Sequence, residues 1–167
     1  MKIAPWTFLT CLLIGCKGYD VSVNDRVVYT PKPLLSDYAV EDRNLDVCLA
    51  QTIKDHKVTQ VAELTRLRCT HAGIETLAGL QKFYALTELD LSDNKITDIT
   101  AVANLGKLRT LILENNAIEN TAPLLNLINL TDLNLAGNPA AGCADLLQLE
   151  TSIDENRGKT SLPEHCQ

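Results

Sequence analysis

The 167-residue chain has few aromatic residues: two phenylalanines, four tyrosines and one tryptophan, which is 4% of the total. Tyrosine and tryptophan are the usual anchors of tight protein interfaces, so their scarcity argues against a strong binding hot spot. No aromatic residue follows Tyr84, which leaves the second half of the chain without such an anchor. Recognition in that half would therefore depend on polar and aliphatic side chains.

Clustered basic residues are also missing. The chain has 15 lysines and arginines against 21 aspartates and glutamates, and its formal net charge is −6. A protein that binds nucleic acid needs a dense positive patch to contact the phosphates. The composition therefore argues against a nucleic-acid partner.

Motifs for catalysis or metal binding are absent as well. The sequence contains no CxxC pair, no glycine-rich phosphate loop and no GxSxG motif. His56, His71 and His165 are scattered and join no spaced set of ligands or nucleophiles. Residues 90–94 read DLSDN, without the glycine and distal glutamate of a calcium loop. We therefore expect no enzyme activity, no metal, no cofactor and no small-molecule substrate.

Leucine, by contrast, is abundant, with 28 of 167 residues, and much of it recurs with one period. Four segments that share the pattern LxxLxLxxNxI begin 22 residues apart, at Leu64, Leu86, Leu108 and Leu130. They read LTRLRCTHAGI, LTELDLSDNKI, LRTLILENNAI and LTDLNLAGNPA. The first has Ala72 in place of asparagine and the last has Ala140 in place of isoleucine, as expected for end repeats. A constant period of this kind indicates a stacked solenoid.

The pattern resembles the leucine-rich repeat, in the 22-residue form of bacterial internalins, over about residues 44–166. The resemblance implies an α/β fold, a short leucine-rich repeat solenoid with a parallel sheet on its concave face. Its convex side would carry short helical turns, near residues 97–105 and 120–127. Three asparagines would turn the chain and bond the backbone of the neighbouring coil: Asn94, Asn116 and Asn138.

The first residues have the form of a targeting signal. In residues 1–15, Lys2 precedes an apolar run that is too short to cross a bilayer. The run ends in Leu-Ile-Gly-Cys, which resembles the bacterial lipobox and implies cleavage before Cys16 and a lipid on its sulfur. Because Lys17 follows instead of aspartate, the resemblance implies the outer membrane of the bacterial cell envelope. An ordinary signal peptide that happens to contain a cysteine is the alternative.

Four further segments follow this predicted signal. Residues 16–41 form a tether, or a hairpin that turns at Asn24 and Asp25. An N-terminal cap helix lies within residues 42–63, the repeats occupy 64–142, and a C-terminal cap occupies 143–167. The cap helix is predicted from helical spacing of Leu45, Cys48, Leu49 and Ile53, with Asp42 or Asn44 as its N-cap.

Of the six cysteines, Cys11 lies in the predicted signal and Cys16 is the predicted lipidation site. The other four allow three disulfide pairings. Because a repeat stack holds its two ends apart, we favour Cys48–Cys69 at one end and Cys143–Cys166 at the other. Each bridge would stabilise the fold by about 3 kcal/mol in the chain-entropy model. Zinc binding is the rival use of these cysteines, and the lack of a CxxC pair speaks against it. The sequence therefore predicts disulfide-linked ends.

The repeat register also predicts which side chains line the concave face. They are Arg66, Arg68, Glu88, Asp90, Thr110, Ile112, Glu114, Asp132 and Asn134. Arg66 would face Glu88 and Arg68 would face Asp90, so these charges either satisfy each other or form a recognition strip. In the second case the chain is a non-enzymatic, lipid-anchored module that binds a protein partner. The alternative is an accessory, assembly or regulatory lipoprotein of an envelope machine that binds through its N-terminal segment.

Overall fold

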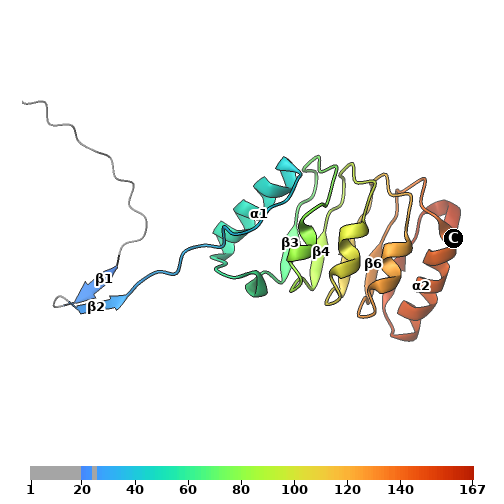
Figure 1. Ribbon diagram of the computed structural model, residues 1–167. Helices are drawn as coiled ribbons and strands as arrows, with labels where there is room; N and C mark the ends of the chain where they lie inside the picture. The colour runs from blue at the N-terminus through green and yellow to red at the C-terminus, as the bar shows by residue number, and fades with distance from the viewer. Residues whose placement is uncertain (1–19, 24–25) are drawn as a thin grey trace, which may run out of the picture. The chain divides into compact units, whose positions relative to one another are not determined.

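The computed structural model describes residues 20–23 and 26–167 (Figure 1). The chain divides into two compact units, the first ending at Pro33 and the second running Leu34–Gln167. The predicted signal peptide, the lipidation site Cys16 and the turn at residues 24–25 lie outside the described residues. No helix in the described ranges is long and apolar enough to cross a membrane.

The first unit contains an antiparallel hairpin of β1 (Val21–Val23) and β2 (Arg26–Tyr29). A hairpin is one of the two forms expected for this segment. Val27 and Val28 are both exposed although they point to opposite faces of β2, so neither face of the strand is covered at these positions. Two strands alone are marginally stable in water. The hairpin therefore has apolar surface available for contact.

The second unit begins ahead of the predicted cap, because residues 34–41 pack on the repeats. The backbone N–H of Leu35 donates to the carbonyl oxygen of Val58 at 2.9 Å. The ring of Tyr38 meets the buried ring of Phe83 edge-on, with 5.5 Å between the ring centroids. This segment was predicted to belong to the tether, and the structure instead makes it part of the cap.

Helix α1 (Arg43–His56) follows, as its apolar spacing predicts. Asp42 is its N-cap, because one carboxylate oxygen accepts from the backbone N–H groups of Asn44 and Leu45 at 2.8 and 3.1 Å. Its buried face consists of Leu45, Leu49 and Ile53. The helix thereby covers the apolar end that the first repeat would otherwise expose.

The other oxygen of Asp42 reaches the first coil, where it accepts from the backbone N–H groups of Glu75 and Thr76. Burial acts to raise the pKa of this carboxyl, but the four backbone donors outweigh it and the pKa is lowered. Asp42 therefore joins the cap helix to the repeats in its ionised form.

Asp42→Ala should destabilise the protein by about 1–2 kcal/mol at pH 7, the usual cost of losing an N-cap. The pKa is lower in the folded state, so this contribution is complete above the unfolded value, about 3.9, and is lost as the pH falls through the folded value. Urea unfolding at pH 7 and in acid should show the gap between wild type and variant closing below about pH 4. Asp154→Ala, at an exposed position of α2 (Cys143–Glu155), is the control and should have no comparable effect. An equal, pH-independent loss of stability in both variants would contradict the role of Asp42 as an ionised N-cap.

The second unit is built on a five-stranded parallel sheet whose strands follow in chain order. They are β3 (Arg66–Arg68), β4 (Glu88–Asp90), β5 (Thr110–Ile112), β6 (Asp132–Asn134) and β7 (Lys159–Ser161). The first four pair in the predicted 22-residue register, with the central leucines Leu67, Leu89, Leu111 and Leu133 aligned and buried. Figure 1 shows these coils stacked between α1 and α2.

The second unit also contains five short 3₁₀ turns. They are η1 (Val61–Glu63), η2 (Leu80–Lys82), η3 (Thr100–Asn104), η4 (Ala122–Asn126) and η5 (Glu164–Cys166). Three of them, η2, η3 and η4, connect consecutive strands. η3 and η4 lie in the two regions predicted to form the convex return. Each of these two buries at least one apolar side chain, such as Val102 in η3 and Leu124 in η4. The turns thus close the core behind the sheet.

The fifth strand, β7, was not predicted. The C-terminal cap continues from α2 into β7, which pairs in parallel with β6. Close packing at the turn explains why Gly158 precedes the strand, since a Cβ there would collide with the carbonyl oxygen of Thr131. The strand itself is polar and lacks the leucine pattern, so no repeat signal marks it.

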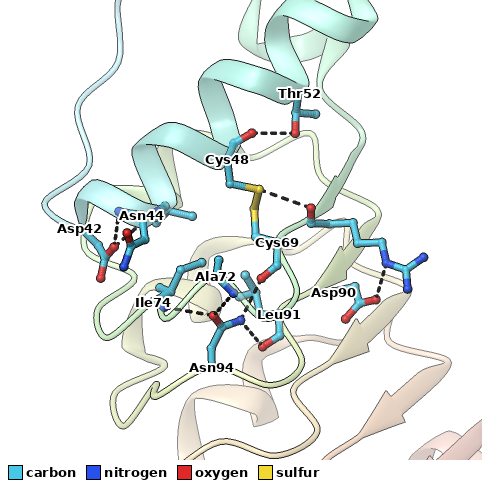
Figure 2. Close-up of a disulfide and its surroundings, with 12 residues drawn as sticks. Asp42, Asn44, Cys48, Thr52, Cys69, Ala72, Ile74, Asp90, Leu91 and Asn94 are labelled. Carbon is cyan, nitrogen blue, oxygen red and sulfur yellow. Dashed lines mark hydrogen bonds and ion pairs between the residues drawn. A yellow bond between two sulfur atoms is a disulfide. The ribbon is translucent and has the colours of Figure 1, made fainter.

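The asparagines form the expected ladder inside the stack. Asn116 accepts from the backbone N–H of Ile96 at 3.0 Å and donates to the carbonyl oxygens of Leu91 and Leu113, also at 3.0 Å. Asn138 makes equivalent bonds between its own coils. Asn94 does the same at the first coil (Figure 2). Among the residues that the structure describes, no buried side-chain polar atom lacks a partner. The ladder therefore supplies hydrogen-bond partners for the buried backbone N–H and carbonyl groups where each strand ends.

A second polar ladder lies one residue earlier in each repeat and was not predicted. His71, Asp93, Asn115 and Gly137 all have left-handed backbone, with φ of 54°, 58°, 54° and 72°. Asp93 pairs with His71 at 3.3 Å and accepts from the Asn115 amide at 2.9 Å. A Cβ at Gly137 would collide with the Asn115 side chain. Histidine, aspartate, asparagine and glycine tolerate this backbone, and that shared property is the signal in the sequence.

Candidate functional site

The structure brings the predicted concave residues together on the sheet. Alternate positions of β3, β4, β5 and β6 point away from the buried leucines, as the period-two geometry of strands requires. Arg66 lies opposite Glu88 and Arg68 lies opposite Asp90, as predicted. Further along the sheet, Glu114 accepts a hydrogen bond from the Asn134 amide at 3.0 Å.

Only one of the two predicted charge pairs forms an ion pair. Nε of Arg68 lies 3.2 Å from a carboxylate oxygen of Asp90 (Figure 2). The other oxygen of Asp90 accepts from the Ser92 hydroxyl at 2.6 Å. The Arg68 side chain is nevertheless 78% exposed, so this pair contributes little to stability. Arg66 and Glu88 are both exposed and form no ion pair within the described part of the chain. The fold therefore leaves these two charges available.

A groove of about 390 Å³ lies between α1 and the first three strands. Its lining comprises Thr52, Asp55, His56, Arg66, Leu67, Arg68, Glu88, Leu89, Asp90, Thr110 and Ile112. One wall of the groove is formed by Thr52, Asp55 and His56 of α1 and was not predicted. These three residues have the spacing of one helix face, which is the signal in the sequence. The predicted residues Glu114, Asp132 and Asn134 lie outside the groove, further along the sheet.

The groove carries charges of both signs. Two arginines face three carboxylates, those of Asp55, Glu88 and Asp90. The apolar surface in the groove includes Ile112, which is half-buried at the end of β5. This arrangement suits recognition of a protein surface with charges of both signs.

The cysteines pair as favoured, with Cys48 joined to Cys69 and Cys143 joined to Cys166. The first bridge ties α1 to the residue that follows β3 (Figure 2), and the second ties the start of α2 to η5. Their Cα atoms are 5.9 and 5.2 Å apart. Both ends of the solenoid are therefore covalently closed, and the first bridge lies next to Arg68 of the candidate site.

The stacked coils, the asparagine ladder and the concave sheet define a leucine-rich repeat solenoid. A sequence profile of the Leucine Rich repeat family matches residues 86–103. A search of curated protein sequences finds no significant match.

The similar solved structures include two internalins. An internalin (inlF) from Listeria monocytogenes strain 4b F2365 is 25% identical, with a TM-score of 0.64 over 74% of this chain and 36% of that chain. An internalin C2 (inlC2) from the same strain is 24% identical, with a TM-score of 0.51 over 62% of this chain and 53% of that chain. This chain therefore has an internalin-like fold and spans about a third to a half of the length of these two proteins.

Proposed function

We propose that this chain is a non-enzymatic module of the bacterial cell envelope that binds a protein partner through its concave face. The observation that carries the proposal is the groove between α1 and β3–β5, where Arg66 and Glu88 are exposed and unpaired within the described residues. Solenoids use such concave surfaces for binding. A partner with complementary charges would pair with both side chains, which favours specificity and rapid association.

The proposal includes a lipid anchor on Cys16, which rests on the lipobox resemblance of residues 13–16. Two or three acyl chains would hold the protein at the outer membrane, since each buried methylene contributes about 0.8 kcal/mol. In cells that express the full chain, the wild type should enter the detergent phase after Triton X-114 separation, whereas Cys16→Ser should remain in the aqueous phase. Mass spectrometry of the wild-type N-terminal peptide should show the lipid. An unmodified Cys16 would contradict the anchor without affecting the concave-face proposal.

A photo-crosslinking amino acid in the native membrane tests the binding face. At position 112, on the concave sheet, it should capture one discrete protein partner. The same replacement at Ile128 is the matched control, because this isoleucine is 85% exposed and lies outside the groove. Capture from position 128 but not from 112 would contradict the concave-face proposal.

Substitution of Arg68, Asp90 and Ile112 together, to alanine, alanine and threonine, should reduce partner capture at least tenfold. The triple variant loses the Arg68–Asp90 ion pair and the two hydrogen bonds that Ser92 donates to Asp90, which together contribute about 1–4 kcal/mol, so the fold should remain. Circular dichroism and urea unfolding would verify this. Unchanged capture by a folded triple variant would contradict binding through the concave face.

The second candidate is binding through the N-terminal segment, as an accessory, assembly or regulatory lipoprotein of an envelope machine. It is favoured by the exposed Val27 and Val28 on a hairpin that belongs to a unit of its own. Deletion of residues 19–33 removes this hairpin and leaves the Leu34–Gln167 unit intact. Loss of capture on this deletion, together with normal capture by the concave triple variant, would favour the second candidate.

A further inference from the structure

The C-terminal cap gathers three side chains of metal-binding type, two of which form a disulfide in the structure. They are Cys143, His165 and Cys166, whose ligand atoms all lie within 4.8 Å of one another. Within the described ranges this is the one group of three or more such residues whose geometry suits an ion. Cys143 and His165 are 22 residues apart, so sequence spacing gives no sign of the group.

We propose that this group holds a zinc ion when the Cys143–Cys166 disulfide is reduced. Zinc binds thiolate at about 2.3 Å and imidazole at about 2.0–2.1 Å, which places tetrahedral ligand atoms roughly 3.5–3.8 Å from one another. The present separation of up to 4.8 Å is close to that geometry. With Cα atoms only 5.2 Å apart, side-chain rotation is enough to separate the two sulfur atoms to about 3.8 Å.

The imidazole is already held in place beside the sulfur atoms. Nε2 of His165 lies 2.9 Å from the carbonyl oxygen of Ala141, which limits rotation of the ring. Contacts of this kind orient metal-binding histidines in proteins. Cys166 is buried, but Cys143 is partly exposed, and His165 is exposed and lines an open groove of about 1050 Å³. Solvent therefore reaches the group from the His165 side, where water can supply a fourth ligand.

Reduction of the Cys143–Cys166 disulfide requires a reductant, and a dithiol supplies the two electrons. Its two thiols lose two electrons and two protons, the disulfide opens to two cysteine thiols, and the reductant becomes a cyclic disulfide. Zinc then binds the two thiolates, and both thiol protons pass to solvent. The ion would join the start of α2 to η5, the segments that the disulfide joins in the oxidised protein. The cap would therefore remain closed in either redox state.

Cobalt titration of the full chain tests the proposal, since Co²⁺ reports tetrahedral thiolate sites in its absorption spectrum. After anaerobic reduction with a phosphine, one equivalent of Co²⁺ should produce thiolate charge-transfer bands, and Zn²⁺ should displace it. Cys143→Ser and Cys166→Ser should each abolish this spectrum. His165→Asn, which leaves both disulfides able to form, should weaken Co²⁺ binding at least tenfold.

The double variant Cys48→Ser, Cys69→Ser is the matched control, because its remaining cysteine pair is the proposed one, and it should keep the cobalt spectrum. Three results would overturn the proposal. They are a reduced wild type without these bands, a spectrum that survives in Cys143→Ser or Cys166→Ser, and unaltered Co²⁺ affinity in His165→Asn.

Discussion

Asn116→Ala should lower the free energy of unfolding by about 3–5 kcal/mol, because the substitution removes three hydrogen bonds to buried backbone groups. Asn116 is only 7% exposed, and its amide serves the backbone N–H of Ile96 and the carbonyl oxygens of Leu91 and Leu113. Alanine would leave these groups without the amide, and each buried group that loses its partner costs about 1–3 kcal/mol. The total is a large part of a typical domain stability of about 5–15 kcal/mol.

Asn129→Ala is the matched control for this substitution. Asn129 is exposed, and its amide makes a single bond, to the carbonyl oxygen of Gly106. Its loss should cost no more than about 1 kcal/mol. Urea unfolding followed by circular dichroism would compare the two variants. Equal losses in Asn116→Ala and Asn129→Ala would show that the buried ladder contributes no more than a surface contact.

Replacing Cys48 and Cys69 with serine should cost about 3 kcal/mol and should loosen the N-terminal end of the stack first. The bridge spans 21 residues, and a loop of this size restricts the unfolded chain by about that free energy. Repeat units contact mainly their neighbours, so the loss should be local. Hydrogen exchange should quicken most in α1 and β3, while α2 and β7 keep their protection.

The variant Cys143→Ser, Cys166→Ser should show the mirror pattern, because its bridge spans a similar 23 residues at the opposite end. Exchange should then quicken in α2 and β7, with α1 unaffected. Uniformly faster exchange throughout the solenoid in both variants would contradict local capping. It would show instead that the whole stack unfolds as one cooperative unit.

Much of this fold can be predicted from the sequence, because a 22-residue period reports directly which positions are buried. Leu89 and Leu111 mark the strands, and Asn94 and Asn116 mark the turns, so strand register and the concave residues follow. The disulfide pairing follows as well, once the stack is known to separate its ends. These features share one property, which is that each repeat carries its own local signal.

The remaining features depend on contacts between distant segments that leave no periodic signal. Tyr38 packs on Phe83 from a segment that reads as a tether, and β7 is a polar strand whose pairing depends on where α2 returns the chain. The helical wall of the groove requires α1 to lie against the edge of the sheet, and His165 meets the second bridge only in the folded cap. Whether Arg66 and Glu88 form an ion pair could not be predicted either, because register sets which residues lie opposite each other but not their side-chain rotamers.

The polar strand β7 also has a consequence for the behaviour of the protein at high concentration. An open parallel sheet presents unpaired backbone groups along its outermost strand, and these can template aggregation with other chains. At the β7 edge of this sheet the strand is only three residues long, Lys159–Ser161, and it begins with an exposed lysine. Short, charged edges of this kind discourage end-to-end polymerisation. We therefore expect β7 to oppose growth of the solenoid into fibres at this end of the sheet.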